Sequence, residues 1–193
     1  LHRDDPARPV GEIMDALAGH ERAGRIRYSG CSNWTAARME EARRYAARAG
    51  MRGFVASQNM WSLARPVPDT LADKTIVAVG DAEVAFHRRT GMAAVPFSSQ
   101  AGGLFAKMER GMEPRPPYRS EDNRARFGRA VAVAKRHGRT VNDVVLAYLL
   151  SQEFAVYPIV GCRTPEQLAS SMAAASFRLG PEELRFLETG EPA

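Results

Sequence analysis

Short apolar segments alternate with longer amphipathic ones along nearly the whole chain, and this alternation restricts the fold more than any other feature. The apolar segments predict strands at 26–30, 54–58, 92–97 and 156–160. They are as short as the buried strands of a parallel sheet are. Strands that alternate with helices predict an α/β fold, in which helices cross over between parallel strands.

Local signals delimit the helices between these strands. Thr35 can cap a helix, and Thr140 with Asp143 three residues later resembles a capping box. Thr164 followed by Pro165 is a typical helix start. A long proline-bearing loop is expected after Gly103. The predicted helices are 9–23, 35–50, 81–89, 121–137, 141–152, one that starts at Thr164 and one that starts at Gly180.

Bulk composition excludes several classes of protein. The 193 residues suit a single domain over 1–193, and 45% hydrophobic residues permit a packed core. No apolar run reaches the length of a membrane span. The net charge of +5 comes from scattered arginines interleaved with acids, so we expect no nucleic-acid partner. Cys31 and Cys162 lack metal or disulfide spacing, so we expect no metal site and a cytoplasmic location. The chain does not begin with Met, which indicates a removed N-terminus or a fragment.

Polar groups stand at each predicted strand end, where a core would exclude them. They are Ser32 and Asn33, then Gln58, then Phe97-Ser98-Ser99-Gln100, and then Arg163. Singly, each has an ordinary explanation: a turn or cap, a loop amide, a core ring, a solvated charge. In parallel α/β folds, however, chemistry takes place at the carboxyl ends of the strands, and these groups occur one set per strand.

Together these groups suit a nicotinamide nucleotide. Hydroxyl and amide side chains can hold a carboxamide, and the Phe97 ring offers a flat face for stacking. The small residues around Gly102 allow backbone N–H groups to approach a pyrophosphate. Arg163, just before a capped helix, suits an adenosine phosphate through its charge and through the helix dipole.

Five ordered motifs resemble the aldo-keto reductase family and cover nearly the whole chain. The family pattern of a strand ending in Leu-His corresponds to Leu1-His2, and its next strand to Gly24-Arg25-Ile26-Arg27-Tyr28-Ser29-Gly30-Cys31-Ser32-Asn33. The remaining motifs correspond to Ala56-Ser57-Gln58-Asn59, to Pro96-Phe97-Ser98-Ser99-Gln100-Ala101-Gly102-Gly103, and to Pro158-Ile159-Val160-Gly161-Cys162-Arg163-Thr164-Pro165-Glu166-Gln167-Leu168.

The resemblance implies a partial (β/α)₈ TIM barrel, in which this chain begins at the end of strand 4 and supplies strands 5 to 8. It implies hydride transfer from NADP(H) to a small aldehyde or ketone. In the implied site, His2 orients the carbonyl, Ser32, Asn33 and Gln58 hold the carboxamide, and Phe97 replaces the usual Tyr or Trp. The implied nucleotide contacts are Ser98, Gln100 and Gly102 at the pyrophosphate, and Arg163, Gln167 and Ser171 (Asn in many members) at the adenosine end.

The family's catalytic Asp, Tyr and Lys belong to a segment that this sequence lacks. Tyr28 and Tyr118 have no lysine placed to lower a pKa, so the chain alone is expected to be inactive. Three alternatives stay open: a fragment of a normal reductase, a non-enzymatic nucleotide-binding or subunit-type protein, and a decayed remnant. Open barrel edges predict self-association. The sequence does not identify the substrate or oligomeric state, and the preference for NADPH over NADH rests on Arg163 and the resemblance.

Overall fold

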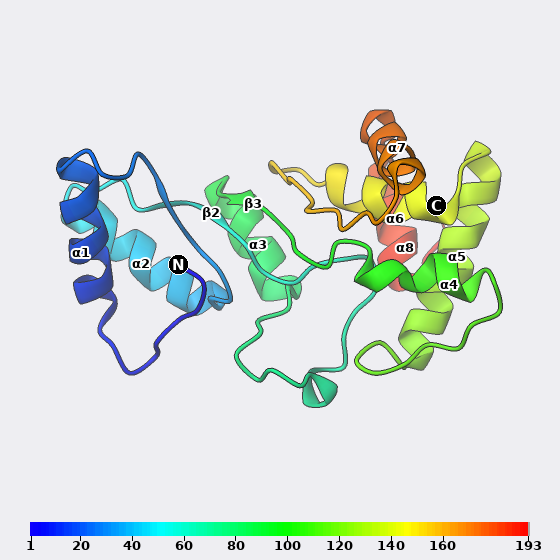
Figure 1. Ribbon diagram of the computed structural model, residues 1–193, viewed down its shortest axis with the longest axis horizontal. Coiled ribbons are helices and arrows are strands. Elements are labelled where there is room, and N and C mark those ends of the chain that lie inside the picture. Colours follow the sequence, from blue (N-terminus) through cyan, green and yellow to red (C-terminus); the bar gives the residue numbers. More distant parts are fainter. Residues whose placement is uncertain (193) are drawn as a thin grey trace.

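A parallel sheet of three strands forms the centre of the computed structural model, which describes residues 1–192 (Figure 1). The strands β1 (Ser29–Cys31), β2 (Phe54–Ser57) and β3 (Ala93–Ala94) lie side by side in sequence order. The helix α1 (Val10–Arg22) precedes β1, while α2 (Ala36–Arg48) and α3 (Asp81–Thr90) connect the successive strands. The predicted α/β class with parallel strands is therefore confirmed.

The segment from Ala155 to Ile159 extends this sheet beyond β3. Ala94 and Val156 form a parallel bridge, and the Tyr157 and Ile159 N–H groups donate to the carbonyls of Ala94 and Pro96 at 2.8 and 2.9 Å. The predicted strand 156–160 is thus reduced to one bridge with flanking hydrogen bonds. On the opposite edge, the amino group of Leu1 donates to the Gly30 carbonyl at 2.8 Å.

β2 begins at Phe54 as predicted, but β1 and β3 begin later than predicted, and all three are shorter, because a strand needs a partner. Pairing between β1 and β2 starts at Ser29, which lies opposite Phe54, the first residue of β2. Residues 26–28 come before Ser29 and therefore have no partner on β2. One extra residue, Val55, interrupts the register between the Ser29–Phe54 and Gly30–Ala56 pairs. The sheet is consequently short and irregular.

The second half of the chain is mainly helical. The helices α5 (Glu121–His137), α6 (Val141–Leu150), α7 (Pro165–Ala173) and α8 (Pro181–Thr189) start where predicted. Thr140 and Asp143 form the expected capping box, and Thr164 accepts a hydrogen bond from the Gln167 N–H. The loop expected after Gly103 was wrong in part, since α4 (Leu104–Met108) occupies its start. Short 3₁₀ turns lie at Pro68–Thr70, Ala101–Gly103 and Ala174–Ser176.

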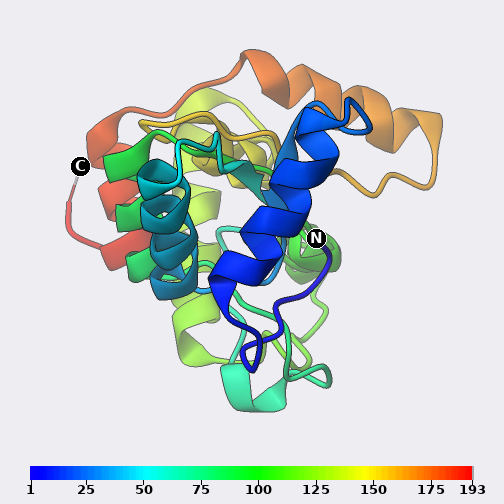
Figure 2. The ribbon, with the colours of Figure 1, turned by 90° about the vertical axis from the view of Figure 1, so that its left-hand side faces the viewer.

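Two buried clusters stabilise the two ends of the molecule. One gathers α1, α2 and β1 around Trp34 and Met39, both fully buried. The other surrounds α6, which is buried along nearly its whole length, as Val144 and Leu149 illustrate. Figure 2 looks along the molecule from the α1 end, with the later helices behind. Among residues 1–192, no helix is both long and apolar enough to cross a membrane.

Helices cover only one face of the sheet. Along the strands the side chains alternate between two faces. Those on the helix side are at most 8% exposed: Ser29, Cys31, Phe54, Ser57, Ala94 and Val156. We call the other side the uncovered face; it comprises Gly30, Val55, Ala56, Ala93, Tyr157 and Ile159. On it Val55, Ile159 and Tyr157 are 39%, 43% and 63% exposed. The described strands therefore form an open part of a barrel and do not close it.

Candidate functional site

A tight turn after β1 holds the first two predicted site residues. Asn33 has a φ of 59°, in the left-handed region that Asn tolerates better than most residues. The Ser32 hydroxyl donates to the Gln58 carbonyl at 2.5 Å and accepts from the Asn33 amide at 3.0 Å. Both residues are buried. The turn at the end of β1 is thus tied directly to the end of β2.

Asn59 fixes this turn from the neighbouring strand. Its side-chain oxygen accepts from the Asn33 N–H at 2.7 Å, and its amide donates to the Trp34 carbonyl at 2.8 Å. Asn59 is 2% exposed. Asn59 was not among the predicted site residues, although it directly follows Gln58 in the same motif. We assign it a positioning role.

Gln58 and Phe97 lie at adjacent strand ends. The Gln58 side chain is exposed, and no hydrogen bond of it occurs among the described residues. The Phe97 N–H donates to the Asn59 carbonyl at 3.2 Å, and the Phe97 carbonyl accepts from Trp61 at 3.2 Å. The half-buried Phe97 is therefore joined through backbone to the residue after Gln58.

His2 lies against the same turn. Its carbonyl accepts from the Asn33 side-chain amide at 3.3 Å, and its imidazole is exposed. The structure thus brings the His2 backbone to Asn33, while no hydrogen bond of the imidazole occurs among the described residues.

The loop after β3 holds the second group of predicted residues. The exposed Ser98 and Gly102 both have positive φ, at 53° and 64°. The Gln100 amide donates to Asn142 at 2.7 Å and to the buried Ser171 hydroxyl at 3.4 Å. Gln100 therefore links the β3 loop to α6 and α7.

Arg163 and Gln167 form the start of α7. The Gln167 side-chain oxygen accepts from the Arg163 N–H at 2.8 Å. Both side chains are exposed, and no ion pair of the Arg163 guanidinium occurs among the described residues. The Ser99 hydroxyl, one residue after Ser98, donates to the Ile159 carbonyl at 2.5 Å. This bond ties the β3 loop to the segment that leads to Arg163.

An open cavity of about 730 Å³ lies beside the β3 loop. It is lined by Gly102, the start of α4 and the proline-bearing segment 112–119. Three of its lining residues are the cations Lys107, Arg115 and Arg119, which form no ion pair among the described residues. These cations could not be predicted from the sequence, because they follow no periodic pattern. The cavity lining does not include Ser32 or Asn33.

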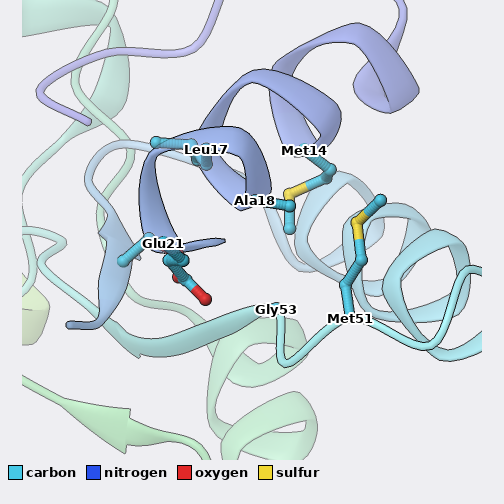
Figure 3. A pocket seen from close by; sticks show the side chains of 7 residues that line it. Met14, Leu17, Ala18, Glu21, Met51 and Gly53 are labelled. Atoms are coloured by element: carbon cyan, nitrogen blue, oxygen red, sulfur yellow. The ribbon is translucent and has the colours of Figure 1, made fainter. Parts of the chain in front are cut away.

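A second hollow is too small for a cofactor. It lies between α1 and the turn before β2, lined by Met14, Ala18 and Met51 among others, and encloses about 10 Å³ (Figure 3). That volume holds about one water molecule at most. Among residues 1–192, no three His, Cys, Asp or Glu side chains come together as a metal site.

The five tyrosines of the described residues differ in burial and in hydrogen bonding. Tyr148 is buried and donates to Glu188, and burial with this carboxylate raises its pKa. Burial also raises the pKa of Tyr118. A hydrogen bond to Asp15 raises the pKa of Tyr45. Tyr28 and Tyr157 are each 63% exposed. In the described part of the chain, the tyrosine hydroxyls that form hydrogen bonds bind Asp15, Met60 and Glu188, and none bonds to a lysine.

The available groups fit a phosphate-bearing aromatic ligand. The Gln58 amide, the Ser98 hydroxyl and the partly exposed Phe97 ring lie at one end of the carboxyl edge of the sheet. Lys107 lies in the last turn of α4, and Arg163 lies in the loop before α7. This donor set offers an amide for a carboxamide, a ring for stacking and positive charge for phosphates.

Two curated relatives match nearly the whole chain. An aryl-alcohol dehydrogenase of Pestalotiopsis microspora is 29% identical, with 98% of this chain and 48% of that protein aligned. An aldo-keto reductase of Aspergillus calidoustus is 31% identical over the same shares. The chain spans about half the length of the curated relatives it matches.

A solved structure supports the fold independently. A thermostable aldo-keto reductase in complex with the inhibitor epalrestat superposes with a TM-score of 0.67 at 24% identity, covering 98% of this chain and 57% of that one. The sequence model of the Aldo/keto reductase family matches residues 1–189 of this chain. The chain therefore belongs to the aldo/keto reductase family, and its open sheet is part of that family's barrel.

Proposed function

We propose that this chain is one structural unit that provides the nucleotide-binding part of an NADP(H)-dependent reductase of aldehydes or ketones. The observation that supports this most is the convergence of four strand ends on one edge of the sheet. Ser32 bonds to the Gln58 backbone, Phe97 to the Asn59 backbone, and Ser99 to the Ile159 backbone. The side chains at these ends fit successive parts of one dinucleotide.

The proposed roles follow the order of the strands. Ser32 and Asn33 shape the carboxamide site, and the exposed Gln58 amide hydrogen-bonds the carboxamide. Phe97 stacks on the nicotinamide ring. Ser98, Gln100, Gly102 and the cavity cations hold the phosphates, while Arg163, Gln167 and Ser171 hold the adenosine end. His2 orients the substrate carbonyl. When bound, NADPH supplies a hydride to that carbonyl carbon.

We propose that the chain alone does not complete this reaction. Reduction of a carbonyl also needs a proton donor, which should titrate near the working pH. The tyrosines with shifted pKa values here are all shifted upward, and none forms a hydrogen bond to a lysine among the described residues. This observation favours the second candidate as well, a non-enzymatic nucleotide-binding subunit. The two free cysteines suit a cytoplasmic location.

A fluorescence titration with NADPH tests the binding proposal. We expect saturable quenching of tryptophan fluorescence, because Trp34 directly follows Asn33. NADPH should not be oxidised when 4-nitrobenzaldehyde is added. Arg163→Ala should raise the Kd about ten-fold, since a charge-assisted hydrogen bond contributes about 1.5–3 kcal/mol.

Arg27→Ala is the matched control, because Arg27 is an exposed arginine just before the amino end of β1. It should leave the Kd unchanged. Absence of saturable binding would contradict the nucleotide site. Ordinary turnover of the aldehyde by the purified chain would contradict the proposed inactivity.

A further inference from the structure

We propose that Arg3 is a positioning residue, which holds the backbone of His2 in place by binding both the His2 carbonyl and the turn at 73–75. This inference rests on the proposed function, because it concerns how His2 is placed to orient a substrate carbonyl. It also assigns a task to the segment 61–79, which supplies none of the proposed nucleotide contacts.

Arg3 joins three groups through one guanidinium. Its Nη1 donates to the His2 carbonyl at 2.9 Å, its Nε to the Thr75 hydroxyl at 2.8 Å, and its Nη2 to the Asp73 carboxylate at 2.9 Å. The N–H donors of an arginine form a rigid planar fork. The three bonds therefore fix the His2 carbonyl relative to the 73–75 turn.

Thr75 keeps the Asp73 carboxylate oriented and ionised. The carboxylate accepts from the Thr75 N–H at 2.9 Å and from the Thr75 hydroxyl at 2.6 Å. These bonds, followed by the bond from Arg3, lower the pKa of Asp73 to about 2. The carboxylate is therefore charged at neutral pH and retains its bond to Arg3.

Hydrogen bonds lead from this turn back to the turn after β1. Val77, which follows the 73–75 turn, donates its N–H to the Asn33 side-chain oxygen at 3.1 Å. The Asn33 amide in turn donates to the His2 carbonyl at 3.3 Å. The contacts thus close a ring through His2, Arg3, the 73–75 turn, Val77 and Asn33. This ring holds His2 beside the turn at which the carboxamide would bind.

The contact of Arg3 affects position more than stability. The side chains of Arg3 and Asp73 are 35% and 44% exposed, and ion pairs at such exposure contribute little to folding. The same segment is anchored independently by Asp4, which pairs with Arg38 of α2 at 3.0 Å, and these side chains are only 12% and 14% exposed. Loss of Arg3 should therefore release His2 without unfolding the segment.

Amide hydrogen exchange in the nucleotide-free chain tests the ring. Arg3→Gln and Asp73→Ala should each speed the exchange of the Val77 N–H about three-fold or more, the order of effect of one exposed ion pair. The double variant should resemble the single variants, because both changes break the same ring. Arg8→Gln is the matched control, since Arg8 is an exposed arginine of the same segment that pairs with Glu12 at 3.2 Å. It should leave the exchange unchanged.

The imidazole of His2 provides a readout that a merely structural role would not affect. Proton NMR follows its signal during titration with NADPH, and His2→Gln identifies the signal among the four histidines. NADPH should displace the signal in the wild type and in Arg8→Gln, because the carbonyl that His2 would orient lies against the nicotinamide. In Arg3→Gln the displacement should be clearly smaller, while the Kd for NADPH and the urea midpoint stay unchanged.

Unchanged Val77 exchange in both Arg3→Gln and Asp73→Ala would overturn the proposal. So would a full displacement of the His2 signal in Arg3→Gln, or a clear fall in its urea midpoint, which would indicate a structural role. Thr75→Val removes only the hydroxyl contact and replaces Asp73→Ala if that variant fails to fold. The exchange measurement needs no nucleotide, so failure of the ring and failure of NADPH binding are distinguishable.

Discussion

Asn59 is a single buried amide that fixes the turn at which we propose the carboxamide binds. It makes no expected contact with the nucleotide, yet it binds the backbone of both Asn33 and Trp34. The Asn33 backbone is left-handed, a conformation that costs free energy unless neighbouring groups hold it. Asn59 therefore keeps the turn after β1, which contains Asn33, in a conformation that the turn would not hold alone.

Asn59→Leu should weaken both stability and NADPH binding. The substitution leaves two buried backbone groups without partners, which costs about 2 kcal/mol or more. We expect a lower urea midpoint and a higher Kd for NADPH. Thr140→Ala is the control: it removes the α6 cap, costs about 1 kcal/mol, and should leave the Kd unchanged. An unchanged Kd in Asn59→Leu would show that the turn does not depend on Asn59.

His87 is a second buried polar residue, held on the helix side of the sheet. Its two ring nitrogens lie 2.8 Å from the Ser57 hydroxyl and 2.7 Å from the Met92 carbonyl, and it is fully buried. Burial lowers its pKa, against the opposing influences of the Met92 carbonyl and Glu83. The folded protein therefore holds His87 neutral.

Stability should consequently fall as the pH drops below about 6.5, the ordinary pKa of histidine. Below that value the unfolded chain takes up a proton that the folded chain binds more weakly, so the free energy of unfolding decreases. Urea unfolding at neutral and at mildly acidic pH measures the difference. His87→Gln should lower stability at both pH values but reduce the difference between them. As a control, His137→Gln at the surface should keep the loss of stability at acidic pH that His87 causes. If His87→Gln lost as much stability between neutral and acidic pH as the wild type does, this assignment would be contradicted.

At the scale of elements, the segment from α4 to α5 carries the cations of the proposed phosphate site. Lys107 ends the short helix α4, and Arg119 precedes α5 across the open cavity. Glu113 is the acid in this lining, and it pairs with Arg124. The cavity is therefore left with a positive charge that suits an anionic ligand.

Lys107→Ala should weaken NADPH binding about ten-fold and reduce its dependence on salt, since one charge-assisted contact is lost. Lys135→Ala, in the last turn of α5, should change neither quantity. Titrations at two ionic strengths give both readouts. Equal behaviour of the two variants would place the phosphates elsewhere.

Most elements could be predicted because their ends depend on neighbouring residues alone. The Thr140–Asp143 box starts α6, and Gly91 and Gly138 end α3 and α5 with left-handed φ. The length of a strand depends on partners that are distant in the sequence. The strands predicted at 26–30 and 92–97 are therefore shorter in the structure than predicted. The five-residue α4 is too short to show a period. The strand-end residues could be named in advance, but Asn59 and the cavity cations depend on contacts between loops.

At the scale of the whole molecule, the uncovered face is the feature that local patterns did not predict in detail. The alternation of strands and helices indicates a parallel sheet, and the family resemblance indicates part of a barrel. How far Tyr157 and Ile159 are exposed depends on what lies opposite them, which no local pattern contains.

The two separate buried clusters also affect how the molecule opens. Phe86 belongs to the cluster around Trp34, whereas the adjacent His87 stacks on Phe154 of the other cluster, with ring centroids 5.2 Å apart. Local unfolding follows such cooperative units, so each half can exchange its amide hydrogens at its own rate. A dinucleotide lying from Gln58 to Arg163 would span both halves and make them fluctuate together.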